Sequence, residues 1–188
     1  MSNFIDVKDN FRQVNRSLKQ MDKSVRQAVL SALNRATQRA KTETGRKTRE
    51  RYVIKQKEVV QTLSVRKAQK STLQAVITSK GHTIPLIKFS VAPKRKLKRA
   101  PKALKAAVFR GGVRKPIPGA FIATAGTHLG VFMRQGKKRL PIDELRGPAV
   151  PSMVGSEEVR EHVQQVYGQE MEKRLPHELD RLLGRLRA

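Results

Sequence analysis

Apolar residues in the first quarter of the chain recur every three or four positions. This spacing keeps them on one face of a helix, so we expect a long helix from about Asn10 to the region of Gly45. Asn10 followed by Gln13 fits the capping-box spacing of a helix start. The stripe consists of Phe11, Val14, Leu18, Met21, Val25, Ala28, Ala32, Ala36 and Ala40. Its alanine-rich half allows another backbone to approach closely, and residues 4–7 ahead of it predict a short strand.

The period of the pattern shortens to about two residues in the middle of the chain. A short helix is expected from Lys55 to Leu63. Residues 72–78 and 87–91 then alternate between apolar and polar positions on either side of a turn signal at Lys80-Gly81, so we expect them to pair as a hairpin. Further strands are predicted at 106–110, 120–125, 131–134 and 139–142, with Pro116, Pro118 and Pro141 favouring edges or loops at their flanks.

The last part of the chain predicts a second long helix. Residues 147–151 have the glycine and proline content of a linker, and Ser156 follows as a helix N-cap with Glu157 and Glu158 in the first turn. Pro176 lies within the pattern, so either one helix kinks there or two helices meet. The apolar stripe is Val159, Val163, Val166, Met171, Leu175, Leu179, Leu182 and Leu186.

These elements together indicate the α+β class: a long N-terminal helix, a small antiparallel sheet or sandwich in the middle and a C-terminal helix. The length of 188 residues suits a single domain. Within it we expect an N-terminal helical arm at 1–51, a basic β-unit at 52–150 and the C-terminal helix at 151–188.

The charge of the chain is its most unusual property. Lys and Arg number 41 against 15 Asp and Glu, which gives a formal net charge of +26 at pH 7. Between Glu58 and Asp143 there is no acidic residue in 84 positions, although 19 are Lys or Arg. A charge of this size favours polyanions or acidic protein surfaces as partners.

Two basic segments are the candidates for partner contact. One is the low-complexity stretch 94–105, and the other follows the strand expected at 131–134. The alternatives for the first segment are a solvated loop between two strands, a phosphate-binding loop on DNA, and a loop that docks on an acidic protein surface. The candidate residues are Lys94, Arg95, Lys96, Lys98, Arg99, Lys102, Lys105, Arg134, Lys137, Lys138 and Arg139.

Recognisable catalytic and metal-binding patterns are missing from the sequence. There is no cysteine, which excludes disulfides, cysteine metal sites and a thiol nucleophile. The histidines have no metal-ligand spacing: we expect His162 and His177 to be solvated, His82 to lie in a turn, and His128 to be a structural residue. We therefore expect a protein that is not an enzyme and has no cofactor or metal.

Two further features of the sequence have simpler interpretations than the functions they resemble. Residues 130–138 resemble a phosphate-binding loop, but the glycine spacing is wrong and no helix pattern follows, so a strand, a turn at Gln135-Gly136 and a basic return strand are favoured. No stretch approaches the ~18 apolar residues of a membrane span, and no signal-peptide pattern opens the chain, so a soluble intracellular protein is expected.

Several segments together resemble the minor tail protein Z family of tailed phages, also called tail completion proteins. They cover most of residues 28–153: ALNRATQRAKTETGRKTRERYVIK, LQAVITSKGHTIPLIKF and PGAFIATAGTHLGVFMRQGKKRLPIDELRGPAVPSM. Their order and spacing carry the resemblance, above all IPL followed by GAFIA, VFMRQGKKRLPI and GPAVPSM. The insertion at 94–105 is less typical of the family.

The resemblance implies a virion structural protein at the head-proximal end of the tail, assembled in the host bacterial cytoplasm. Its neighbours there would be the tail terminator protein and the head connector proteins. It would help to finish the tail, join it to the head and hold the end of the double-stranded DNA genome. The family brings no catalytic residues, cofactor, membrane contact or small-molecule substrate.

A homo-oligomeric ring is the assembly that we expect, because closed rings are built from heterologous contacts. The alanine-rich half of the first helix and the stripe of the last helix are candidate surfaces between subunits, although packing within one subunit is favoured for both. The alternative function is a free basic nucleic-acid-binding protein, nucleoid- or ribosome-associated, for which the charge alone is sufficient. The six Phe, two Tyr and absent Trp argue against it, because few aromatic rings are available to stack on bases.

Overall fold

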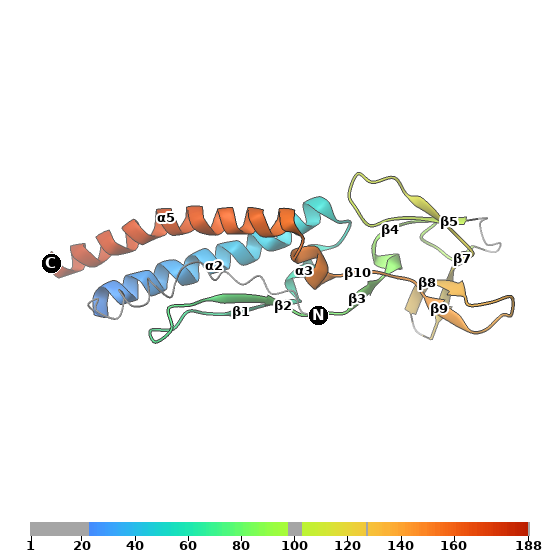
Figure 1. The fold of residues 1–188 in the computed structure, drawn as a ribbon, viewed down its shortest axis with the longest axis horizontal. Helices are drawn as coiled ribbons and strands as arrows, with labels where there is room; N and C mark the ends of the chain where they lie inside the picture. The colour runs from blue at the N-terminus through green and yellow to red at the C-terminus, as the bar shows by residue number, and fades with distance from the viewer. Residues whose placement is uncertain (1–22, 98–102, 127, 188) are drawn as a thin grey trace.

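Two long helices lie side by side and form one half of the molecule (Figure 1). The computed structural model describes residues 23–97, 103–126 and 128–187. The helix α2 (Lys23–Arg51) and the helix α5 (Glu157–Arg187) run in opposite directions, and a β-hairpin lies along them. We call the two helices and this hairpin the shaft. The small sheets lie at the opposite end of the elongated molecule from the C-terminus.

The two predicted apolar stripes pack against each other within the shaft. Ala32, Ala36 and Ala40 are almost completely buried on α2, and Val159 and Val163 are fully buried on α5. Small side chains let the two backbones approach closely, so these stripes form core inside one subunit. The favoured interpretation, packing within one subunit, is therefore confirmed for these parts of the two stripes.

Helix α2 continues one and a half turns beyond Gly45, where the sequence pattern ended. Gly45 is buried, and a Cβ on it would approach Val60 Cγ2 at 3.2 Å. The hydroxyls of Thr44 and Thr48 donate to the carbonyls four residues earlier, at 2.8 and 2.7 Å. The polar side chains of this last part are thus satisfied by the helix itself. The predicted helix start near Asn10 and the strand at 4–7 lie outside the described residues.

The shaft hairpin differs from the predicted one. Strand β1 (Leu63–Arg66) pairs with β2 (Val76–Ser79), after a short helix α3 (Gln56–Val60). The predicted partner of 72–78, residues 87–91, instead begins in a 3₁₀ turn η1 (Leu86–Lys88). The alternating pattern marks strands but not their pairing, and Leu63, expected at the end of the short helix, begins β1 instead.

A two-stranded ladder links the shaft to the sheets (Figure 1). Strand β3 (Thr83–Pro85) pairs with β10 (Arg146–Ala149), which leads directly into the short helix α4 (Val150–Val154). The prediction of a linker at 147–151 is therefore wrong. Gly147 lies in β10, and the Phe89 ring explains the glycine: a Cβ there would lie 2.5 Å from Phe89 Cε2.

Six short strands form the far end, which we call the tip (residues 90–144). One sheet has the order β4-β5-β6, with β4 (Ser90–Ala92), β5 (Ala103–Ala107) and β6 (Lys115–Pro118). The other has the order β7-β8-β9, with β7 (Ala120–Ala125), β8 (His128–Arg134) and β9 (Ile142–Glu144). Pro116 and Pro118 lie on the edge strand β6, as expected, because proline cannot donate to a second neighbour.

The predicted α+β class is confirmed by this arrangement. Helix α5 starts directly after Ser156 and continues through Pro176 as one helix. One cluster of buried apolar residues extends from Val163 in the shaft through Phe89 to Leu104 and Val131 in the tip. The shaft and the tip therefore share a continuous core.

Candidate partner-binding site at the tip

Positive charge dominates the tip. Residues 90–144 contain fourteen Lys or Arg and only two acidic residues, Asp143 and Glu144. Both carboxylates already have partners: Gln135 Nε2 donates to Asp143 Oδ2 at 2.7 Å, and Glu144 lies 3.0 Å from His128 Nε2 and 3.3 Å from Arg146 Nη1. The contact of His128 with Glu144 supports its predicted structural role. Neither carboxylate forms an ion pair with a described Lys or Arg of the tip.

A groove with an apolar floor opens between the two sheets of the tip. Its volume is about 680 Å³, within the usual range for ligand pockets. Residues 93–97 after β4, strand β7 and the β8–β9 turn form its walls. The apolar lining includes Leu97, Leu104, Phe121, Ile122, Leu140 and Ile142.

Four of the predicted contact residues meet at this groove. Arg95 and Lys96 come from the β4–β5 connection, whereas Arg134 and Arg139 come from the end of β8 and the following turn. The guanidinium of Arg134 lies 4.9 Å from the centre of the Phe121 ring, a cation–π contact that holds it over the groove. Two basic segments almost forty residues apart are thus joined in one site.

The other predicted contact residues lie elsewhere. Lys137 and Lys138 are exposed in the β8–β9 turn but do not line the groove. Lys105 lines a hollow on the other face of its sheet, because its neighbour Leu104 points into the groove and side chains alternate along a strand. Lys98, Arg99 and Lys102 lie outside the described residues.

A second basic surface, which the sequence did not reveal, lies where the tip meets the shaft. Two adjoining hollows share Val53 and Arg110 and contain the predicted residues Lys94 and Lys105. The additional cations are Arg49, Lys55, Lys88, Arg110 and Arg114. They come from three separate parts of the chain, around residues 49–55, 88 and 110–114, so no local cluster could signal them.

The segment that resembles a phosphate-binding loop forms a strand followed by a turn, as favoured from its sequence, but the basic return strand expected at 139–142 is wrong, because β9 begins only at Ile142. Gly130 and Val131 lie within β8, and residues 135–139 form the turn before β9. No helix follows whose N-terminus could hold a phosphate. Lys137, Lys138 and Arg139 are therefore exposed on a turn between two strands.

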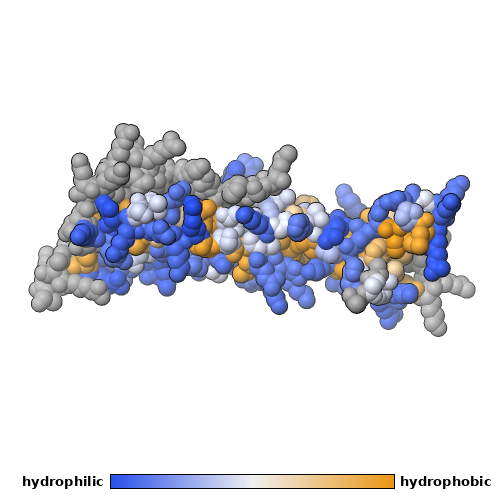
Figure 2. All heavy atoms as spheres, turned by 90° about the horizontal axis from the view of Figure 1, so that it is seen from below, coloured by the Kyte–Doolittle hydropathy of each residue, from blue (hydrophilic) through white to orange (hydrophobic). Residues whose placement is uncertain are grey.

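Within the part of the chain that the structure describes, the exposed large apolar side chains lie in the tip. Among the described residues, the large hydrophobic side chains that remain exposed are Leu97, Phe109, Val113, Leu129, Met133 and Leu140. Figure 2 shows a hydrophobic patch at this end, bordered by hydrophilic residues. Exposed apolar surface with a polar rim is typical of protein interaction sites.

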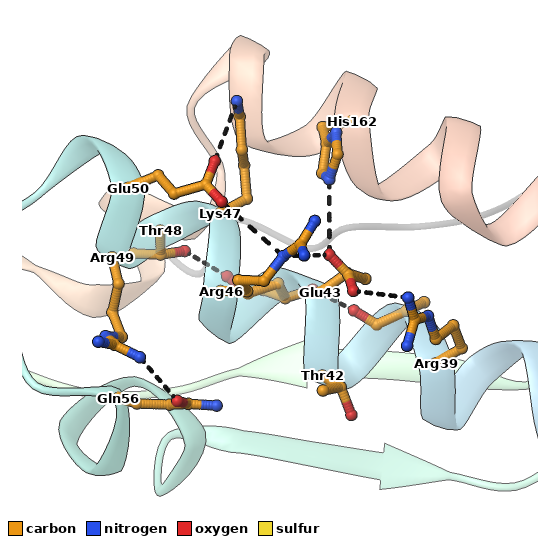
Figure 3. Close-up of polar contacts among 12 residues, drawn as sticks. Arg39, Thr42, Glu43, Arg46, Lys47, Thr48, Arg49, Glu50, Gln56 and His162 are labelled. Atoms are coloured by element: carbon orange, nitrogen blue, oxygen red, sulfur yellow. Dashed lines mark hydrogen bonds and ion pairs between the residues drawn. The ribbon is translucent and has the colours of Figure 1, made fainter.

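The polar cluster of the shaft has a structural role. Glu43 is buried between the helices, with Arg39 Nη2 at 3.1 Å, Arg46 Nε at 2.9 Å and His162 Nε2 at 3.7 Å (Figure 3). The prediction that His162 is solvated is wrong, because it faces Glu43, whereas His177 is exposed as expected. Lys47 and Arg51 add ion pairs to Glu158, so charges of opposite sign join α2 to α5.

The described residues show neither a group of three His, Asp or Glu side chains placed to hold a metal ion nor a helix long and apolar enough to cross a membrane. An elongated fold whose described, exposed large apolar side chains lie at one end is typical of a structural subunit that contacts other macromolecules.

Comparison with known proteins supports the same class. The family model described as prophage minor tail protein Z (GPZ) matches residues 11–187, and the chain belongs to this family. The resemblance found in the sequence is thereby confirmed. The protein is a phage minor tail protein, and its place is the virion. No curated protein and no solved structure matches the chain.

Proposed function

We propose that this minor tail protein is a tail completion subunit at the head-proximal end of the tail, where it joins the tail to the head. The observation that carries the proposal is the unequal distribution of contact surface. The tip combines fourteen cations and only two acidic residues with exposed apolar side chains, whereas the shaft contains nine acidic residues, several of which form ion pairs with its cations. A subunit of this design can be held in the tail by its shaft and contact neighbouring proteins with its tip.

The partners of the tip in this proposal are the tail terminator protein and the head connector proteins. An acidic surface on either would be attracted to the tip, and the attraction would orient the subunit during joining. Copies of the subunit form a ring through surfaces other than the stretch from Ala28 to Ala40 and the pair Val159 and Val163, because these parts of the stripes are buried inside each subunit.

The second basic surface is suited to contact with the end of the genome. Lys94, Lys105 and Arg114 lie in or beside its hollows without an ion pair among the described residues. Each phosphate contact steepens the salt dependence of binding by about 0.9 in log K against log salt. The K105E/R114E variant should therefore flatten the slope for a short DNA duplex by about 2. The R35E/R66E variant changes the same charge in the shaft, and an equal flattening there would remove the genome contact from the proposal.

A phage that carries a stop codon at Tyr52 tests the proposal as a whole. Negative-stain microscopy of its lysate should show heads and tails that stay apart, or joined particles that fail to deliver DNA. Supplying the protein from a plasmid should restore infectious particles. Normal, infectious particles without the plasmid would overturn the proposal and favour a free nucleic-acid-binding protein.

A further inference from the structure

We propose that the tip groove binds an extended peptide segment of another virion protein, which adds to β7 as a further strand. The peptide alternates apolar side chains, which enter the groove, with carboxylates, which face the rim cations. This inference rests on the proposed function in one respect: it takes the tip as the end that meets other proteins of the particle.

Strand β7 has a free edge along the groove. In its sheet it pairs only with β8, from Ala120 opposite Met133 to Ala125 opposite His128. Among the described residues, its backbone has no further backbone hydrogen bond. Such an edge presents a row of unpaired donors and acceptors that an added strand can use.

The lining of the groove shows that this edge faces it. Six consecutive residues, 119–124, line the groove. Side chains alternate between the two faces of a strand, so one face alone would contribute every second residue. A consecutive run indicates that the groove lies along the edge of the strand, where the backbone is within reach of a ligand.

The floor of the groove fits amino-acid side chains better than nucleic acid. Leu104 and Ile122 are buried at its base, and Leu97 and Leu140 are exposed at its margin. A DNA duplex presents phosphates and sugars to a surface and has no apolar group to place in such a cavity. An extended peptide places a side chain there at every second position.

The rim supplies the charge selection. Arg95, Lys96, Arg134 and Arg139 form no ion pair with any described residue. Arg134 stacks on Phe121, so both lie on the face of the sheet opposite Ile122. A strand beside β7 therefore directs alternate side chains toward Arg134, and an aspartate or glutamate at those positions gains a charge-assisted hydrogen bond.

A synthetic peptide tests this geometry with the full-length protein. The probe is a fluorescein-labelled nine-residue peptide in which isoleucine or valine alternates with aspartate, measured by fluorescence polarisation at 0.3 M salt. A composition-matched peptide with its aspartates in one block should bind at least tenfold more weakly. A version N-methylated at alternate amides should lose a similar factor, because it cannot complete the ladder with β7. Equal affinities of all three peptides would overturn the proposal.

Variants of the groove complete the test. R134E/R139E should weaken the alternating peptide at least tenfold, while R35E/R66E, with the same charge change in the shaft, should change its affinity less than twofold. L140S provides a groove variant of unchanged charge and should weaken binding several-fold. Equal losses in the two charge variants would mean attraction by net charge alone and would contradict the proposal. A groove variant that loses affinity for duplex DNA but keeps its affinity for the peptide would also contradict the proposal.

The peptide measurement is independent of phage morphology. If the alternating peptide binds as described but the phage with a stop at Tyr52 assembles normally, the proposed function fails and the groove remains a peptide site. If joining fails but the peptides are not distinguished, the strand-addition proposal fails alone.

Discussion

The shaft and the tip are built from the same chain with opposite treatment of apolar and charged side chains. In the shaft, alanine, valine and leucine are buried between two helices, and Glu43 and Glu158 neutralise neighbouring cations. In the tip, large apolar side chains remain exposed, and most cations face no carboxylate. Features that cost stability are therefore concentrated in one region, which is expected where a surface serves binding rather than folding.

Replacing a leucine with alanine in each region should give the largest difference in the free energy of unfolding between the shaft and the tip. Leu33 is 1% exposed in the shaft and packs with Val29, Ala68 and Leu73. Leu33→Ala should lower the free energy of unfolding by about 2–5 kcal/mol through lost burial and a cavity. Leu140, 65% exposed at the groove, is the matched control, and Leu140→Ala should change stability by less than about 0.5 kcal/mol. Urea denaturation measures both, and equal losses would remove the distinction.

The buried carboxylate of the shaft predicts the next largest effect. The Glu43 side chain is 3% exposed among Arg39, Arg46 and His162. Glu43→Gln keeps the size but removes the charge that those groups face, and should cost about 2 kcal/mol. Glu50, 52% exposed beside Arg46 and Lys47, offers the comparison. Glu50→Gln should cost less than about 1 kcal/mol in the same urea titration. A larger loss for Glu50 would show that burial does not decide the value of these pairs.

A pair of hydrogen bonds ties the hairpin to the shaft helices. Asn34 donates from Nδ2 to the Ala68 carbonyl at 3.3 Å and accepts from the Ala68 N–H at 2.8 Å. Asn34→Ala should cost about 1 kcal/mol and speed hydrogen exchange at the Ala68 amide. Asn34→Asp keeps the acceptor for that amide and should protect it better than alanine does. Unchanged exchange in Asn34→Ala would mean that other contacts hold the hairpin.

The smallest predicted effect is a pH dependence on α5. A hydrogen bond from Arg174, at 2.7 Å, lowers the pKa of Glu170 below its ordinary value, against a smaller opposing effect of burial. A lowered pKa in the folded state adds stability that is present above the ordinary pKa, about 4.3, and is lost as the pH falls through the folded value. The stability difference between wild type and Glu170→Gln should therefore shrink from pH 6 to pH 3. In the Arg174→Gln background this change should be weaker, and an equal change there would assign it to another group.

The sequence predicted the helices better than the sheets because a helix is a local structure. The apolar spacing from Ala28 to Ala40 is enough by itself to predict a helix and its buried face. A single strand can be predicted in the same way, as the matching bounds of β7 show. Strand pairing depends on distant segments: β2 takes β1 rather than residues 87–91, and β3 takes β10. The glycine and proline content of residues 147–151 predicts a linker, but Gly147 lies inside strand β10. A glycine is needed there because the Phe89 ring leaves no room for a Cβ.

The site was predictable as a set of charges but not as a shape. Both basic segments were visible from Arg95 to Arg139, yet the groove between them exists only once β5 and β7 lie side by side. His162 was assigned to solvent because its polar face on α5 gives no hint of Glu43 on α2. Contacts between elements carry this information, and the order of residues along one element does not.

Complementation of the phage with a stop codon at Tyr52 tests most directly the claim that folding depends on the shaft and function on the tip. Plasmids would supply the R95E/R134E/R139E protein, altered at the groove, or the R35E/K57E/R66E protein, altered by the same charge in and beside the shaft. Unfolding midpoints of both should stay close to wild type. The groove variant should leave heads and tails unjoined with a loss of infectious titre of at least a hundredfold, and the shaft variant should restore nearly full titre. Equal titres for the two proteins would contradict the account.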